Sequence, residues 1–183
     1  MILPELAADL AAVDDATARL LRTVEGLTDG DLRAPSLLPG WSRAHVVTHV
    51  ARHADGMCNL LTWARTGVIT SAYPSHAERE AGIDAGAGRG PGELHADVSA
   101  SADRLRADAV ALPPEAWTAQ VQIFERPPFP AAEVLLRRLV EVELHHVDLG
   151  SGYRPEDWPA AFAVRELAEP LASFRADRVA WFS

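Results

Sequence analysis

The residues of this chain that could do chemistry are histidines and a glutamate at helical spacing. His45, His49 and His53 follow one another at intervals of four, and Glu141 and His145 are also four apart. Residues four apart stand one turn apart on the same face of a helix, so each set can converge on one point. Two imidazoles and a carboxylate on facing helices form an open site for a divalent metal. We therefore predict that His49, Glu141 and His145 bind one metal ion.

The residue types restrict the metal without identifying it. They favour zinc, with a fourth position left for water or substrate, but nickel, cobalt or iron would also accept them. His45 and His53 lie on opposite flanks of His49, and we expect them to support the ligands or to form the pocket wall. A Glu-x-x-x-His pair also arises by chance in many helices, which would make these histidines ordinary hydrogen-bonded residues. The remaining histidines are expected at the surface: His76, His95 and His146.

Four other residue types could take part in chemistry. Asp148 could orient a ligand or cap its helix, and we expect the cap. Cys58 is the only cysteine, which excludes an intrachain disulfide and a multi-cysteine metal cluster, and without a nearby base it should be a small core residue. Arg79 could reach into a cleft from a loop, although most such arginines are solvated. Aromatic residues of the core or pocket are expected at Trp41, Trp63 and Trp117.

The elements that position these residues are predicted to be helices. Apolar residues recur at helical spacing in five segments, residues 4–27, 43–65, 93–112, 131–149 and 159–181. Ser42 is a predicted N-cap and Gly67 a predicted stop for the second of these. Pro170 should kink or break the last one. The breakers in residues 28–40 predict an ordered connector.

Two segments carry weaker patterns. Five glycines between residues 82 and 92 interrupt any long helix, so a short helix near residues 75–80 followed by a loop is expected. Residues 121–124 alternate briefly and predict a short extended segment at most. The pattern as a whole predicts an all-α protein.

Composition restricts the class of protein further. A chain of 183 residues with 48% apolar residues suits one compact domain, or one domain plus a short extension. Its net charge of -9 provides no basic surface for nucleic acid. No apolar run reaches the roughly 20 residues of a membrane span, and Glu5 and Asp9 stand where a secretory signal would be positive. We expect a cytoplasmic protein.

Three stretches of the chain resemble the mycothiol-dependent maleylpyruvate isomerases, a family within the DinB-like thiol-dependent metalloenzymes. They are residues 39–51 (PGWSRAHVVTHVA), 58–67 (CNLLTWARTG) and 141–150 (EVELHHVDLG). The stretches keep the order and approximate separation of the family, and the resemblance covers most of residues 1–150. It implies a DinB-like four-helix bundle over residues 1–150, with a C-terminal helical extension over residues 151–183.

The resemblance also implies a site and a reaction. The family's metal, typically zinc, is held by residues that correspond to His49, Glu141 and His145, and an arginine implicated in substrate handling corresponds to Arg79. The implied reaction is the cis to trans isomerisation of a ring-cleavage dicarboxylate in aromatic compound degradation, with mycothiol as the thiol cofactor. A metal-activated thiolate would add to the double bond, the single bond would rotate, and elimination would release the trans product. Arg79 would pair with a substrate carboxylate, and the metal could alternatively polarise the keto oxygen.

Two other functions are compatible with the same residues. A mycothiol S-transferase would use the metal to conjugate electrophiles, and a non-catalytic module would only bind metal or thiol. The expected partners are a small-molecule substrate and a low-molecular-weight thiol, without nucleic acid or membrane; the oligomeric state is unknown. The sequence departs from the family twice. Family isomerases usually continue into a small α/β C-terminal domain that these 183 residues do not include. At position 53 relatives often carry an amide side chain, whereas this chain has a histidine. The imidazole of His53 could therefore approach the metal as well.

Overall fold

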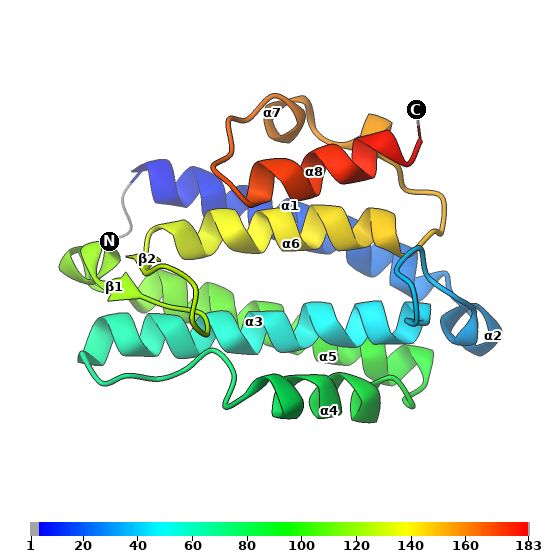
Figure 1. Ribbon diagram of the computed structural model, residues 1–183, viewed down its shortest axis with the longest axis horizontal. Helices are drawn as coiled ribbons and strands as arrows, with labels where there is room; N and C mark the ends of the chain where they lie inside the picture. Colours follow the sequence, from blue (N-terminus) through cyan, green and yellow to red (C-terminus); the bar gives the residue numbers. More distant parts are fainter. Residues whose placement is uncertain (1–3, 183) are drawn as a thin grey trace.

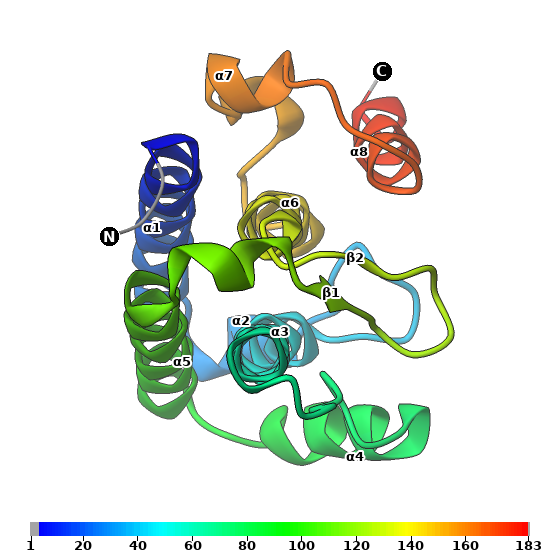
Figure 2. The ribbon, with the colours of Figure 1, turned by 90° about the vertical axis from the view of Figure 1, so that its left-hand side faces the viewer.

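The computed structural model describes residues 4–182 and is mostly helical, as predicted. Four long helices run side by side as a bundle, and in cross-section each contacts two others (Figures 1 and 2). They are α1 (Pro4–Glu25), α3 (Arg43–Thr66), α5 (Pro91–Ala111) and α6 (Glu133–Asp148). The shorter helices are α2 (Asp29–Arg33), α4 (His76–Gly86), α7 (Ala160–Ala163) and α8 (Leu171–Ala180). The predicted all-α, DinB-like four-helix bundle with a C-terminal helical segment is confirmed.

The ends of α3 follow the predicted signals. The side chain of Ser42 accepts a hydrogen bond from the backbone N–H of His45, which caps the start of the helix. Gly67 adopts a left-handed conformation with φ of 71° directly after Thr66, which glycine allows at little cost. Because both ends are set locally, the histidines of α3 have a fixed place along the bundle.

The segment after α3 differs from the prediction. We expected a helix near residues 75–80 and then a loop, but α4 continues to Gly86, so the expected loop was wrong there. Gly86 is required by packing, because a Cβ at this position would lie 2.3 Å from Cγ2 of Thr48 on α3. A glycine that signals a breaker in the sequence thus serves here as a point of close approach between two helices.

Short irregular elements complete the chain. Of the extended segment predicted at residues 121–124, only Val121 lies in a strand, β1 (Gln120–Val121), which pairs antiparallel with β2 (Phe129–Pro130). Two 3-10 turns span Pro114–Thr118 and Pro155–Asp157. The predicted helix over residues 159–181 is divided into α7 and α8, and α8 begins directly after Pro170.

The C-terminal elements lie on the outside of the bundle. Figure 2 shows α7 and α8 beyond α6, and α8 contacts α6 directly. The proposed division of the chain at residue 150 stays a prediction, and residues 1–3 and 183 lie outside the described part of the chain. No helix among residues 4–182 has both the length and the apolar character needed to cross a membrane.

Candidate metal centre

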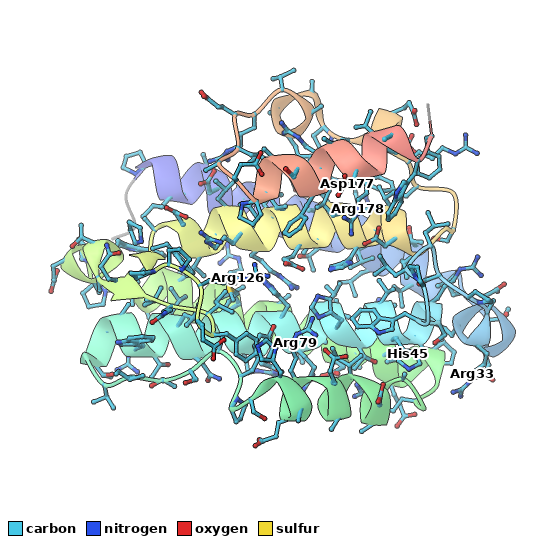
Figure 3. All side chains as sticks on the ribbon, in the orientation of Figure 1. Arg33, His45, Arg79, Arg126, Asp177 and Arg178 are labelled. Atoms are coloured by element: carbon cyan, nitrogen blue, oxygen red, sulfur yellow. The ribbon has the colours of Figure 1, made fainter. Side chains whose placement is uncertain are left out.

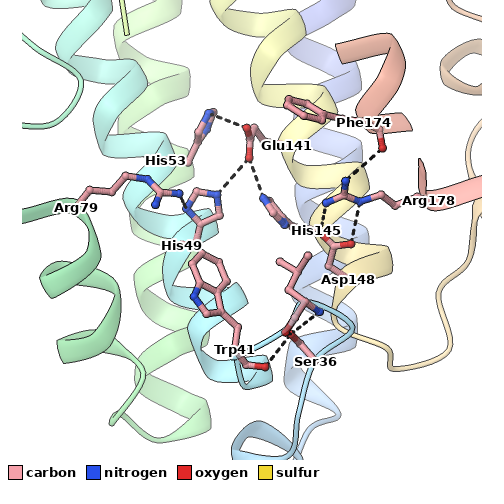
Figure 4. Close-up of polar contacts among 11 residues, drawn as sticks. Ser36, Trp41, His49, His53, Arg79, Glu141, His145, Asp148, Phe174 and Arg178 are labelled. Carbon is pink, nitrogen blue, oxygen red and sulfur yellow. Dashed lines mark hydrogen bonds and ion pairs between the residues drawn. The ribbon is translucent and has the colours of Figure 1, made fainter. Parts of the chain in front are cut away.

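The structure brings together the three residues predicted as metal ligands. His49 lies on α3 and faces Glu141 and His145 on α6 (Figure 4). Oε2 of Glu141 lies 3.3 Å from Nε2 of His49 and 3.0 Å from Nε2 of His145. One potential ligand atom from each residue lies within 4.8 Å of the other two. Two imidazoles and one carboxylate at this separation could hold a divalent metal ion and leave a coordination position open.

Asp148 orients the imidazole of His145. Nδ1 of His145 donates a hydrogen bond to Oδ2 of Asp148 at 2.8 Å, so Nε2 is the nitrogen that faces Glu141. A carboxylate behind a histidine ligand is a recurrent arrangement in metal sites. Burial lowers the pKa of His145, but the hydrogen bonds with Asp148 and Glu141 outweigh it and raise the pKa to about 9. The expected helix-capping role of Asp148 was wrong, because its side chain is buried and directed at His145.

Arg79 contacts the imidazole of His49, the second histidine of the candidate ligand set. Its Nη2 donates to Nδ1 of His49 at 3.1 Å, and the same guanidinium pairs with Glu80 on α4. An arginine can only donate, so Nδ1 of His49 accepts and the proton of the neutral ring sits on Nε2. Burial lowers the pKa of His49 to about 4, which keeps the ring neutral. Coordination through Nε2 needs the proton on Nδ1, so it excludes the hydrogen bond from Arg79.

Glu141 has the charge that a metal ligand requires. Burial raises its pKa, but the electrostatic interaction with His53 and hydrogen bonds from His145 and His49 outweigh that effect and hold the pKa well below its usual range. Nε2 of His53 lies 3.8 Å from Oε1 of Glu141, and burial lowers the pKa of His53 to about 3. His53 therefore forms a neutral wall beside the carboxylate, in agreement with the pocket-wall prediction.

A fully buried arginine beside this centre was missed by the sequence analysis. Nη1 of Arg138 donates to the backbone oxygen of Val50 at 2.7 Å and lies 3.4 Å from Nδ1 of His53. Burial lowers the pKa of Arg138 to about 10, and Glu141 is the foremost charge that opposes this shift. Its position three residues before Glu141, on the same helix face, was the available signal.

The candidate ligands line a cavity of about 800 Å³, a size that suits a small molecule. Trp41 forms one wall, with its ring 5.5 Å from that of His49. Figure 3 shows three arginines that line the cavity from different elements: Arg79 on α4, Arg126 between β1 and β2, and Arg178 on α8. Arg79 therefore reaches into a cleft as predicted, but it does so from helix α4 rather than from a loop.

The other histidines lie apart from the three ligands. His45 does not line the cavity; its Nδ1 lies 2.7 Å from Oγ of Ser42 at the start of α3. His76 is exposed at the cavity rim, where it stacks on Phe124 with ring centroids 3.7 Å apart. His95 is half-buried on α5.

The surface position predicted for His146 was wrong. This side chain is buried on the side of α6 that faces α1, where its Nε2 lies 2.7 Å from Oγ1 of Thr23. The ring of Tyr153 stacks on it at 3.7 Å, and burial lowers the pKa of His146 to about 4. Adjacent residues of a helix point about 100° apart, so His145 and His146 face different neighbours.

Cys58 and the tryptophans occupy the places expected for packing residues. Cys58 is half-buried against the core, and burial raises the pKa of its thiol to about 12, so it is not an activated nucleophile. Trp117 is buried and Trp63 packs against the same core cluster.

Comparisons with known proteins agree on one family. Residues 13–150 match the family described as the mycothiol maleylpyruvate isomerase N-terminal domain. The chain is similar to the crystal structure of the mycothiol-dependent maleylpyruvate isomerase, with 33% identity and a TM-score of 0.81 over 86% of this chain and 65% of that one. A histidine-to-alanine mutant of that enzyme gives 32% identity and a TM-score of 0.80 with the same coverage. The chain thus spans 65% of the length of each structure. No curated protein matches it.

Proposed function

Because the chain belongs to the family of mycothiol maleylpyruvate isomerase N-terminal domains, we propose that it is a metal-dependent and mycothiol-dependent maleylpyruvate isomerase. The observation that carries the proposal is the group of His49, Glu141 and His145 at the wall of a cavity lined by arginines. Its partners would be a small-molecule dicarboxylate and a low-molecular-weight thiol rather than nucleic acid or a membrane. The metal would be zinc, the usual choice of two histidines and a carboxylate.

The charges around the cavity suit anionic reactants. The chain as a whole carries a net charge of -9, yet the lining of this cavity contains three arginines, Arg79, Arg126 and Arg178, against two glutamates, Glu125 and Glu141. A dicarboxylate and a thiolate together bring three negative charges, which an acidic surface without these arginines would repel. The planar guanidinium groups of Arg79 and Arg126 could each bind a substrate carboxylate through two parallel hydrogen bonds, whereas Arg178 is already paired with Asp148. The cavity is therefore better suited to a dicarboxylate than to a neutral substrate.

The residues of the chain have distinct tasks in this proposal. His49, Glu141 and His145 would hold the metal, which would lower the pKa of a coordinated thiol and so supply the thiolate needed for addition to the substrate's double bond. Asp148 keeps Nε2 of His145 directed toward Glu141. Arg79, once it no longer donates to His49, can pair with a substrate carboxylate in the same cavity.

In this proposal the thiol comes from outside the chain. Cys58 is the only cysteine, and burial raises its pKa to about 12, so almost none of it is thiolate at neutral pH. It also does not line the cavity of about 800 Å³ in which the candidate ligands lie. An exogenous thiol such as mycothiol is thus the expected nucleophile.

The test is turnover by the zinc-loaded chain. Maleylpyruvate is supplied with and without mycothiol, and formation of the trans isomer is followed for the wild type, Glu141→Gln and Glu125→Gln. Both glutamates line the cavity, but only Glu141 belongs to the candidate ligand set. We expect thiol-dependent turnover in the wild type and in Glu125→Gln, and loss of zinc and turnover in Glu141→Gln.

A second substrate class separates this proposal from its alternatives. Turnover of a haloarene electrophile with mycothiol, but not of maleylpyruvate, would replace the isomerase by a mycothiol S-transferase. Bound zinc without turnover of either substrate would leave a metal- or thiol-binding module. Isomerisation that proceeds equally well without added thiol would contradict the proposed chemistry.

A further inference from the structure

The C-terminal helix α8 forms part of the cavity that holds the candidate metal ligands. Phe174 and Arg178 line this cavity and are four residues apart, so they share the face of α8 that is directed at α6. Helix α8 lies beyond residues 13–150, the part of the chain that matches the family. One wall of the cavity is therefore built by a segment outside the matched domain.

Arg178 makes a two-point contact with Asp148. Its Nε donates to Oδ1 at 3.0 Å and its Nη2 donates to Oδ2 at 2.8 Å (Figure 4). The side chain of Asp148 is fully buried, and that of Arg178 is 12% exposed. Two parallel hydrogen bonds fix the plane of a carboxylate as well as its position. Asp148 thus has one orientation set by a residue thirty positions further along the chain.

One oxygen of this carboxylate also accepts a hydrogen bond from a candidate metal ligand. Oδ2 of Asp148 accepts from Nη2 of Arg178 and from Nδ1 of His145, both at 2.8 Å. Rotation of the carboxylate would misalign the hydrogen bond with His145, and this bond directs Nε2 of His145 toward Glu141. The contacts form one continuous path from α8 to the candidate centre.

We propose that Arg178 is a positioning residue of the metal centre, which it controls through Asp148 and His145. This inference rests on the metal site of the proposed function. It makes α8 a part of that site and not only a helix packed on the outside of the bundle. A purely structural role would be different: the ion pair would only attach α8 to α6, and any other contact that attaches α8 would matter equally.

The test measures zinc affinity of the full chain by competition with a chromophoric chelator, for the wild type, Arg178→Ala, Arg178→Lys and Arg175→Ala. Arg175 is the matched control, because its Nη1 donates to the backbone oxygen of Phe162 at 2.7 Å and attaches α8 without contacting Asp148. The absorption spectrum of the cobalt-substituted protein is recorded for each variant, because it reports ligand geometry independently of turnover.

We expect Arg178→Ala to weaken zinc binding by about 10- to 100-fold, the usual effect of losing support behind a ligand. The cobalt spectrum should change with it. Arg178→Lys should be intermediate, because lysine keeps the charge without the two-point geometry, and Arg175→Ala should stay within about threefold of the wild type.

Unchanged affinity in Arg178→Ala, or an equal loss in Arg175→Ala, would overturn the positioning role. The result is separable from the proposed reaction. If zinc affinity depends on Arg178 but the protein does not isomerise maleylpyruvate, only the proposed isomerase activity is overturned. If the protein isomerises maleylpyruvate but its zinc affinity does not depend on Arg178, only this inference is overturned. A wild-type chain that binds no zinc would overturn both.

Discussion

Replacement of Arg79 by alanine should strengthen metal binding while it weakens catalysis. The hydrogen bond from Nη2 of Arg79 to Nδ1 of His49, 3.1 Å long, requires Nδ1 to be the accepting nitrogen. A metal at Nε2 requires Nδ1 to carry the proton, so metal binding to the wild type must first break this contact. Arg79→Ala removes that cost and a nearby positive charge.

The size of the effect follows from the contact. A hydrogen bond that involves a charged group contributes about 1.5–3 kcal/mol. The lower end applies here, because the Arg79 side chain is 21% exposed and also pairs with Glu80. Since about 1.4 kcal/mol corresponds to a factor of ten in affinity, zinc should bind Arg79→Ala about tenfold more tightly. The same variant loses a partner for a substrate carboxylate, so kcat/KM should fall by roughly tenfold or more.

The assay is chelator competition for zinc, followed by turnover of maleylpyruvate with mycothiol. Arg126→Ala is the control: Arg126 lines the same cavity and brings the same charge, but none of its hydrogen bonds found among residues 4–182 reaches the three candidate ligands. We expect a much smaller change in zinc affinity for this control. Zinc affinity in Arg79→Ala that equals or falls below that of Arg126→Ala would refute the reasoning.

Three further results are expected. His145, with its pKa raised to about 9, is protonated at pH 7 and must lose that proton to bind a metal, so zinc affinity should rise with pH up to about 9. Calorimetry in buffers of different ionisation enthalpy should detect the release of about one proton at pH 7, and its absence would contradict this assignment. Gly86→Ala should lower the free energy of unfolding, measured in urea, by about 1–3 kcal/mol, because the added methyl group would overlap with α3. Gly82→Ala in the same helix should raise the free energy of unfolding by up to about 1 kcal/mol, because its methyl group meets open space. Equal effects of the two variants would argue against close packing of α4. Glu143→Gln should cost about 3 kcal/mol of unfolding free energy, because the buried carboxylate pairs with Arg19 at 2.5 Å. A loss below about 1 kcal/mol would be typical of an exposed pair and would contradict a buried role.

Local sequence patterns were sufficient for the long helices and for the helix faces that carry the candidate ligands. Ser42 and Gly67 mark the two ends of α3. Each acts on backbone groups that lie within about one helical turn of it. The i, i+4 spacing of Glu141 and His145 determines that they share a helix face, whatever the rest of the chain does. These properties depend on hydrogen bonds and steric contacts between residues that are close in the sequence, so they can be predicted from the sequence alone.

Local patterns were insufficient for the length of α4. Glycines destabilise a helix in isolation, so the sequence predicted an early stop, but tertiary packing against α3 stabilises the helix as far as Gly86. The burial of His146 has a similar origin. Its spacing was compatible with solvent, and only the position of α1 and of Tyr153 encloses it.

The partners of the candidate ligands were decided by tertiary structure alone. Arg79 reaches His49 and Arg178 reaches Asp148 across 30 residues of sequence in each case. Such contacts depend on how helices rotate and pack against one another, and no short-range spacing encodes that arrangement. The sequence by itself therefore determined that Glu141 and His145 share one helix face and that His49 lies on another helix, because each helix face follows from local periodicity. That the two faces meet was decided by the packing of α3 against α6. Which charged groups stand behind those ligands was decided only when α4, α6 and α8 packed around them.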